Sequence, residues 1–332
     1  MTKKTKKKHN YYRKAINGKK TLKKTRKSRK TRNKHSQDPF TKHGYINNNN
    51  NNNSRRVNCS PKKKNELNNF TCYTDRSLFK LKELWNQRHP DVILKTNNPK
   101  DIHSQLSYLL GNVCRNEVCW LNQKYHFGNV HEDLIEDFAP SQPLSWKKNP
   151  SEWLSSVDIM NVMNQYEKAY NCFEFFGPSP IDFDKRKLYG ECVWNEICNF
   201  NLRDQIKNGK RKFGFIFNTD PHFKDGEHWI SLFVDCKAKE ITFFDSTGDP
   251  IPRQIKTLVK RIKNQSEQLK PPISLKYKHT EGKQHQTGNT ECGIYCLYFI
   301  INMLRDKTNA KILKTTHLPD NFMRQYRHRY FN

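Results

Sequence analysis

Hydrophobic residues are scarce in this sequence: they make up 34% of its 332 residues, which is low for a chain that folds along its whole length. Acidic residues are nearly absent from residues 1–64, where Asp38 is the one acid against 23 Lys and Arg. Such a segment buries too little apolar surface to offset the entropy of ordering. We therefore predict that residues 1–64 form a disordered basic tail.

The positive charge is concentrated in this tail. The formal net charge is +29, yet the residues beyond position 64 hold 38 Lys and Arg against 31 Asp and Glu, a net charge of +7. The runs Lys3–Lys8 and Lys23–Lys34 are typical of non-specific nucleic-acid binding through counterion release, of a nuclear targeting signal, or of a solubility device. The sequence does not separate the first two. Asn47–Asn53 is a low-complexity linker.

Long apolar runs are also missing. The longest, Ile294–Ile301, is too short to span a bilayer, and the charged start of the chain lacks the apolar stretch of a secretory signal. We expect a soluble intracellular protein with no membrane partner. In that setting its ten cysteines are expected to be reduced thiols and not a disulfide framework.

Residues 65–148 are predicted to form a mostly helical extension, because 77–85 and 101–125 show helical apolar spacing. From residue 149 to 332, predicted strands and helices interleave in an α+β pattern, which favours a central mixed β-sheet flanked by helices. The predicted strands are 172–176, 212–218, 228–234, 240–245 and 273–278. The predicted helices are 150–170, 255–269 and 292–304. A short polar turn at 236–239 predicts a hairpin between the third and fourth strands.

Four residues of the extension are candidate zinc ligands: Cys114, Cys119, His126 and His131. The gap between Cys119 and His126 is short for a zinc finger, and positions five apart on a helix point in different directions. We therefore expect neither a metal site nor a cofactor.

Two polar residues flank the predicted hairpin. His228 opens its first strand, and Asp245 ends its second, so the hairpin returns Asp245 to the place where His228 begins. A carboxylate there can orient an imidazole and stabilise its protonated form. Taken alone, each residue is equally consistent with a structural role.

The segment Gln286–Gly293, Gln-Thr-Gly-Asn-Thr-Glu-Cys-Gly, leads into an apolar helix with Cys292 in its first turn. A thiol at a helix N-terminus experiences the positive end of the helix dipole, which favours the nucleophilic thiolate. Beside His228 it would complete the Cys–His pair of a thiol protease. Gln286 and the backbone N–H of Cys292 are predicted to stabilise the oxyanion. Cys296, one turn later, is expected to be buried and inert.

The order His-Trp, strand-end Asp, then Gln six residues before Cys-Gly resembles the ubiquitin-like-protein-specific (SUMO) and adenovirus-type cysteine protease clan. The likeness covers residues 150–332, about half the chain. It implies that fold, with His228, Asp245 and Cys292 as the catalytic triad. Trp153 and Trp229 resemble the tryptophans that select glycine at the cleavage site, although Ser155-Ser156 stand where the family has Asn-Asp.

The basic tail, the asparagine run and the helical extension resemble the maturation proteases of giant DNA viruses. We expect a thiol endopeptidase that cuts after small, Gly-Gly-like residues in viral core or capsid precursors, located in the virion and the cytoplasmic viral factory, or in the nucleus. A deconjugase that removes SUMO-like or ubiquitin-like modifiers from host proteins is the close alternative, because fold does not decide substrate. A non-catalytic nucleic-acid-binding virion protein is the third.

Overall fold

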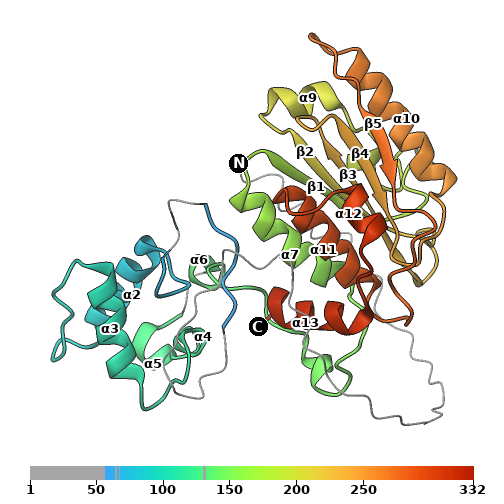
Figure 1. Ribbon diagram of the computed structural model, residues 1–332. Helices are drawn as coiled ribbons and strands as arrows, with labels where there is room; N and C mark the ends of the chain where they lie inside the picture. The colour runs from blue at the N-terminus through green and yellow to red at the C-terminus, as the bar shows by residue number, and fades with distance from the viewer. Residues whose placement is uncertain (1–56, 64–65, 67, 130–131) are drawn as a thin grey trace, which may run out of the picture. The chain divides into compact units, whose positions relative to one another are not determined.

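The computed structural model describes residues 57–63, 66, 68–129 and 132–332 (Figure 1). Residues 1–56, most of the predicted tail, lie outside the described residues. Within the described part of the chain, no helix combines the length and apolar character that crossing a bilayer requires.

The extension is built from helices around a hydrophobic core of its own, which contains the fully buried side chains of Tyr73, Leu106 and Phe127. Its helices are α2 (Asp75–Arg88), α3 (Pro99–Leu110), α4 (Glu117–Trp120), α5 (Lys124–Phe127) and α6 (Glu132–Ile135). The predicted helix 77–85 is confirmed within α2.

The predicted helix 101–125 is wrong beyond Leu110, where α3 ends. Gly111 follows directly, and a new helix starts only at Asn116, whose side chain accepts the backbone N–H of Cys119. A glycine after the last apolar residue is a common helix stop. Apolar spacing continues past this glycine because α4 packs its own side chains into the same core.

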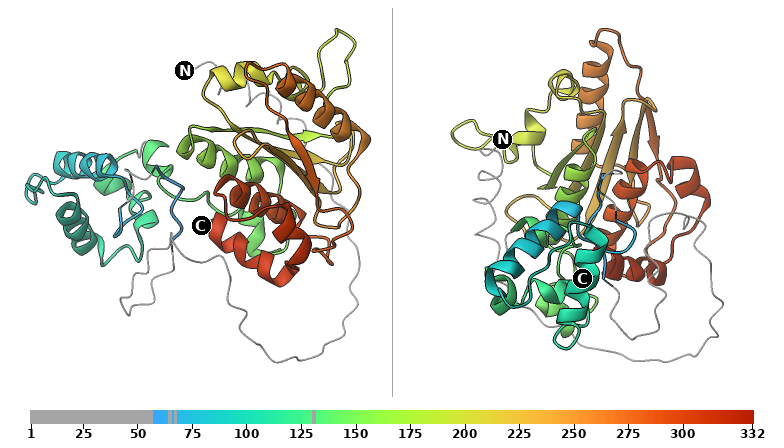
Figure 2. Two further views of the ribbon diagram at one scale, coloured as in Figure 1. Left: turned by 45° about the horizontal axis from the view of Figure 1, so that its top comes forward. Right: turned by 90° about the vertical axis from the view of Figure 1, so that its left-hand side faces the viewer.

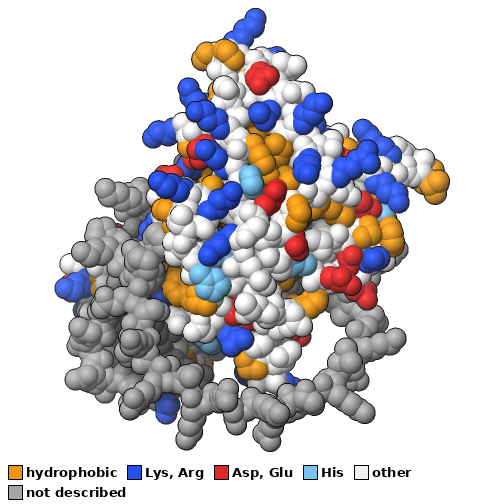
Figure 3. Space-filling view, turned by 45° about the vertical axis from the view of Figure 1, so that its right-hand side comes forward, with side chains coloured by type: hydrophobic (Ala, Val, Ile, Leu, Met, Phe, Trp, Pro, Cys, Tyr) orange, Lys and Arg blue, Asp and Glu red, His pale blue; other side chains and the backbone are white. Residues whose placement is uncertain are grey.

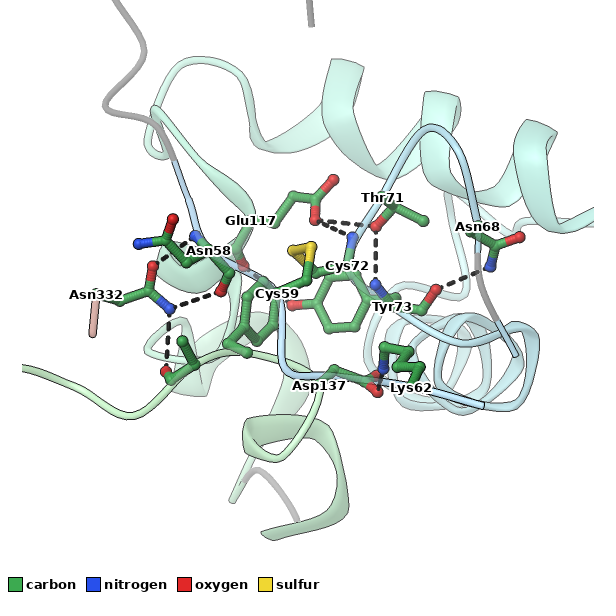
Figure 4. Close-up of a disulfide and its surroundings, with 12 residues drawn as sticks. Asn58, Cys59, Lys62, Asn68, Thr71, Cys72, Tyr73, Glu117, Asp137 and Asn332 are labelled. Carbon is green, nitrogen blue, oxygen red and sulfur yellow. Dashed lines mark hydrogen bonds and ion pairs between the residues drawn. A yellow bond between two sulfur atoms is a disulfide. The ribbon is translucent and has the colours of Figure 1, made fainter. Parts of the chain in front are cut away.

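A disulfide between Cys59 and Cys72 ties the start of the described chain to the extension (Figure 4). Cys59 also forms an isolated β-bridge with Phe138, and Lys62 forms an ion pair with Asp137. The extension therefore begins before residue 65, since residues 57–63 are built into it and not into the tail.

Three disulfides are present in the structure, so the prediction of reduced cysteines is wrong for six of the ten. They join Cys59 to Cys72, Cys114 to Cys119, and Cys192 to Cys198. Folding of short segments brings the paired Cα atoms to 5.0, 5.5 and 6.3 Å from each other, within the range that a disulfide requires. Composition and expected compartment carry no information about this local proximity. The unpaired cysteines are Cys172, Cys236, Cys292 and Cys296.

A five-stranded mixed sheet organises the rest of the chain. Its strands are β1 (Phe173–Pro180), β2 (Lys212–Asn218), β3 (Trp229–Asp235), β4 (Glu240–Phe244) and β5 (Lys276–His279). They lie in the order β1-β2-β3-β4-β5. The two outer pairs are parallel and the two central pairs antiparallel, which confirms the predicted hairpin and the predicted mixed sheet.

Helices cover both faces of the sheet (Figures 1 and 2). Phe213, Phe215 and Phe217 alternate along β2 and pack on one face with α8 (Asn195–Cys198), α9 (Leu202–Lys207) and α10 (Arg253–Glu267). The opposite face, with Ile216 and Phe233, packs against a second group of helices. These are α7 (Ser156–Ala169), α11 (Cys292–Leu304), α12 (Ala310–Thr315) and α13 (Asp320–Tyr330). The short 3-10 helix η3 (Leu144–Lys147) adds Trp146 to this face.

Helix α7 starts later than predicted. Ser155 is its N-cap: the hydroxyl accepts the backbone N–H of Asp158 at 3.2 Å, and the Asp158 carboxylate accepts the N–H of Ser155 at 2.8 Å. This reciprocal capping satisfies two N–H groups that have no partner inside the helix. The segment before it is thereby left outside the helix, which carries Trp153 into a loop.

Helix α11 has the predicted bounds, and all of its side chains are buried. It approaches the sheet closely at Gly214, where a Cβ atom would lie 2.9 Å from Cγ2 of Ile300. A side chain at position 214 would crowd Ile300 and Phe173, so glycine suits this close approach. The sheet therefore fixes the position of α11, and with it the position of Cys292.

The residue before α11 carries a buried charge. The carboxylate of Glu291 contacts Nε of Arg327, on α13, at 2.8 Å, and both side chains are almost completely buried. The Arg327 guanidinium also donates to the carbonyl of Thr290 at 2.9 Å. Helix α13 thus holds the start of α11.

We expect Arg327→Ala to lower the free energy of unfolding by about 3–5 kcal/mol, because it leaves the Glu291 carboxylate buried without its partner. The matched control is Arg324→Ala. Arg324 approaches the same carboxylate at 3.7 Å, but its side chain is 57% exposed, so the loss should stay below about 1 kcal/mol. Urea denaturation of both variants measures the difference, and equal losses would contradict it.

Candidate active site

His228 and Asp245 meet at one edge of the sheet. Strands β3 and β4 are antiparallel, with Ser231 opposite Phe244, so the loop that enters β3 lies beside the residue that follows β4. Nε2 of His228 lies 2.8 Å from Oδ1 of Asp245. The same carboxylate oxygen accepts the backbone N–H of Thr247 at 2.9 Å and its hydroxyl at 2.7 Å. The backbone and hydroxyl of Thr247 therefore fix the carboxylate that faces the imidazole.

The environment of His228 favours its protonated form. Burial by itself would lower the pKa of the imidazole, but hydrogen bonds to the Asp245 carboxylate and to Cys292, with the charges of both groups, raise the pKa to about 10. With Nε2 at the carboxylate, Nδ1 is the ring nitrogen left for Cys292. The predicted trio of His228, Asp245 and Cys292 is brought together in the structure.

Cys292 is the first residue of α11 and is buried. The first N–H groups of a helix have no partner inside it, and they carry the positive end of the helix dipole. Cys292 thus begins the helix beside the imidazole of His228. Cys296 differs in kind, because complete burial raises the pKa of its thiol well above the usual value. The two cysteines of α11 are thus chemically distinct.

Gln286 is buried six residues before Cys292. Its Oε1 accepts the hydroxyl of Ser246 at 2.7 Å, and its Nε2 donates to the carbonyl of Gly288 at 2.9 Å. A side-chain amide carries two N–H hydrogens, so the bond to Gly288 uses one of them.

The loop between Gln286 and Cys292 is held from α13. One carboxylate oxygen of Asp320 accepts the backbone N–H groups of Thr287, at 3.1 Å, and Gly288, at 2.8 Å, and also the Thr287 hydroxyl at 2.8 Å. The other carboxylate oxygen accepts the hydroxyl of Tyr295, on α11, at 3.0 Å. Although burial opposes it, these hydrogen bonds lower the pKa of Asp320. The carboxylate therefore stays ionised as it fixes the loop.

Trp229 contacts the segment Trp153–Leu154 near the start of α11. The indole N–H of Trp229 donates to the carbonyl of Leu154 at 3.0 Å. Leu154 packs on the first turn of α11 so closely that a Cβ atom on Gly293 would lie 2.8 Å from its Cβ. Trp153 is 41% exposed, so it is not a core aromatic residue. The structure therefore places Leu154 against the helix turn that carries Cys292, with the Trp229 indole hydrogen-bonded to the Leu154 carbonyl.

The four candidate zinc ligands do not form one cluster of free ligands. Cys114 and Cys119 are joined in a disulfide, and Nδ1 of His126 lies 3.1 Å from Nε2 of His89. His131 lies outside the described residues. In the part of the chain that the structure describes, no group of three or more His, Cys, Asp or Glu is arranged to hold a metal ion.

Sequence reasoning missed the residues that hold this site in place: Ser246, Thr247, Asp320 and Arg327. Ser246 and Thr247 follow Asp245 directly, so their place at the strand end is readable from the sequence. No signal points to Asp320 and Arg327, because they contact a loop 33 and 36 residues away in the chain.

We expect the imidazole of His228 to titrate near pH 10, far above its ordinary value of 6.5. Asp245→Asn should lower this pKa, because it removes the negative charge that favours the imidazolium. The Cε1 proton shift of His228, followed by NMR against pH, measures both values. Asp182→Asn is the matched control: it alters the pair that Asp182 makes with His222 at 2.7 Å and should leave the His228 titration unchanged.

The same titration affects stability. Because the pKa of His228 is higher in the folded chain, the stability from its protonation is fully present below about pH 6.5. It is lost as pH rises towards 10. Asp245→Asn should show a smaller loss of unfolding free energy over this interval. A wild-type His228 that titrates near 6.5 would contradict both expectations.

Known proteins match this chain in the segment that contains the candidate site. Residues 215–332, which include His228, Asp245, Gln286 and Cys292, match the Ulp1 protease family, C-terminal catalytic domain. A protein of Acanthamoeba polyphaga mimivirus that is named as a thiol protease is 28% identical over 269 residues, or 74% of this chain and 84% of the relative. A SUMO-1 cysteine protease of African swine fever virus is 30% identical over 207 residues, or 59% of this chain and 73% of the relative.

A crystal structure of an African swine fever virus protease has the same fold. It aligns with a TM-score of 0.55 at 19% identity and covers 83% of this chain and 95% of that chain. This coverage exceeds what residues 150–332 can supply, so the likeness to the viral protease reaches into the extension. The predicted family, fold class and link to giant viruses are confirmed. The chain belongs to the Ulp1 family of thiol proteases.

Proposed function

We propose that this chain is a thiol endopeptidase in which Cys292 is the nucleophile, His228 the general base and acid, and Asp245 the residue that orients His228. The observation that carries this assignment is the 2.8 Å contact between His228 and Asp245, made beside the cysteine that begins α11.

The chemistry follows from these positions. The Cys292 sulfur attacks the carbonyl carbon of the scissile bond. His228 carries the proton that the sulfur has given up. As the C–N bond breaks, His228 gives this proton to the departing amine, leaving a thioester on Cys292. Water, deprotonated by His228, then attacks the thioester and releases the acid. Asp245 stabilises the imidazolium throughout without taking the proton.

The negative oxygen that forms in each attack requires hydrogen-bond donors. We assign this role to the backbone N–H of Cys292 and the side-chain amide of Gln286. The contacts of Gln286 support the assignment, since they keep the amide in one place before substrate arrives.

Substrate selection is proposed to rest on Trp153 and Trp229. Trp229 donates to the carbonyl of Leu154, which packs on Gly293 in the first turn of α11. Trp153 directly precedes Leu154, so we propose that both indoles line the path of a substrate whose carbonyl reaches Cys292. The two indoles are proposed to exclude side chains larger than hydrogen or methyl at this position. We therefore propose cleavage after glycine or another small residue, as in a Gly-Gly ending.

The proposed substrates are viral structural or core precursors, cleaved in the virion or the viral factory. The alternative is removal of a ubiquitin-like modifier, which is favoured by the name of the relative from African swine fever virus, a SUMO-1 cysteine protease. SUMO or ubiquitin with a C-terminal fluorophore separates the two. Efficient release of the fluorophore, compared with a Gly-Gly peptide bearing the same fluorophore, would favour the deconjugase.

We expect Cys292→Ala to abolish cleavage of a Gly-Gly peptide and to remove the iodoacetamide adduct at position 292, because it removes the proposed nucleophile. Cys172, which is unpaired and exposed, remains open to iodoacetamide in both chains. Cys296→Ala is the matched control: same helix, same substitution, but a buried thiol whose raised pKa makes it unreactive. It should retain activity and at most destabilise the core. An active Cys292→Ala protein would contradict the assignment. Chelators should have no effect.

The basic tail is proposed to bind nucleic acid without sequence preference. On the face drawn in Figure 3, Lys and Arg side chains are most numerous over the upper half, with few Asp and Glu among them, so the contribution of the tail has to be measured against this basic surface of the folded part. Cys59 is part of a disulfide, which places the end of any tail deletion before residue 57.

Deletion of residues 1–56 should therefore sharply weaken binding to duplex DNA and leave cleavage of a short peptide unchanged. For the full chain, the logarithm of affinity should fall by about 0.9 for each phosphate contacted per logarithmic unit of salt. Fluorescence anisotropy at matched salt measures both chains. Equal affinities would show that the tail is not the nucleic-acid site.

A further inference from the structure

Ser246 lies between Asp245, which contacts His228, and Gln286, the proposed oxyanion donor. It follows Asp245 directly, and its side chain is 1% exposed. Its hydroxyl donates to Oε1 of Gln286 at 2.7 Å. Its carbonyl accepts the backbone N–H groups of both His285 and Gln286, each at 2.8 Å. One residue therefore holds the main chain and the side chain of Gln286 together.

These contacts decide which end of the Gln286 amide faces which way. Oε1 can only accept a hydrogen bond, and it points to the Ser246 hydroxyl. Nε2 can only donate, and it points to the Gly288 carbonyl at 2.9 Å. A rotated amide would place Oε1 against that carbonyl, where neither oxygen has a hydrogen to share. The observed orientation leaves the second N–H of Nε2 for an oxyanion.

The terminal torsion of a glutamine side chain is broad and roughly two-fold, so orientation has to come from partners. Without the Ser246 hydroxyl, Oε1 would be buried with no donor, and an unpaired buried acceptor is unfavourable. The amide would then rotate or shift to find another partner. The donor needed in the transition state would no longer be held in advance, which is the condition for its effect.

We propose that Ser246 is a positioning residue that orients the Gln286 amide as the oxyanion donor. This inference deepens the proposed function and rests on it. Asp245 and Ser246 then form a pair of consecutive residues with parallel tasks: Asp245 orients the imidazole of His228, and Ser246 orients the amide of Gln286. The end of β4 thereby aligns both the proton-transfer group and the oxyanion donor.

A double-mutant cycle on kcat tests the proposal, with Ser246→Ala, Gln286→Ala and the combined variant assayed on a Gly-Gly peptide. Gln286→Ala should lower kcat by roughly ten- to a thousand-fold, as for loss of one oxyanion donor. Ser246→Ala should lower kcat by roughly ten-fold with little change in KM, because the donor is misplaced and not removed. In the Gln286→Ala background, Ser246→Ala should have almost no further effect, because residues that act through one another are not additive.

Two further measurements exclude a merely structural effect. The rate at which iodoacetamide labels Cys292 should be unchanged in Ser246→Ala, because His228 and Asp245 set that reactivity. Ser179→Ala is the matched substitution: Ser179 is also 1% exposed, but its hydroxyl has no partner within the described residues. It should leave kcat unchanged.

The outcomes separate the two hypotheses. If Gln286→Ala leaves kcat unchanged, the oxyanion role in the proposed function fails. If Gln286→Ala lowers kcat but Ser246→Ala does not, only the role of Ser246 is overturned. Equal effects of Ser246→Ala in both backgrounds, or a parallel loss of Cys292 labelling, would also overturn that role.

Discussion

The burial of α11 is the constraint on which the site depends. The helix is enclosed on all sides by the sheet, α7 and α13, and the backbone approaches its neighbours directly at Gly214 and Gly293. A helix packed in this way cannot slide along its axis without creating clashes or cavities. Its first residue is therefore held at a fixed place on the sheet edge, and Cys292 reaches its partners because of core packing.

Much of this architecture can be predicted from sequence, for a physical reason. Strand β2 and helix α11 have the predicted bounds because each is strongly apolar and ends at a polar residue. His228, Asp245 and Cys292 could be identified because their separations follow from local elements: a hairpin brings the first two together, and a helix start marks the third. The role of Gln286 follows from its place in the loop before Cys292, and the roles of the tryptophans follow from the family resemblance. The roles of all these residues stay predictions.

The features that sequence could not provide depend on contacts between distant segments. Nothing local to Asp320 or Arg327 indicates that α13 would return to the loop before Cys292. The disulfides were missed because expected compartment was weighed and folding proximity was not. Helix α7 begins after the predicted start at residue 150 because Ser155 and Asp158 form a capping box. In each case the deciding interaction is a contact between particular residues, which composition and periodicity do not reveal.

Helix α13 has a consequence for the order in which the protein becomes competent. The loop from Gln286 to Cys292 takes its anchors from Asp320 and Arg327, which the ribosome adds only after the loop itself. A nascent chain that has just exposed Cys292 therefore holds His228, Asp245 and Cys292 but lacks the helix that shapes the loop before Cys292. The site can therefore assemble fully only after α13 has emerged from the ribosome.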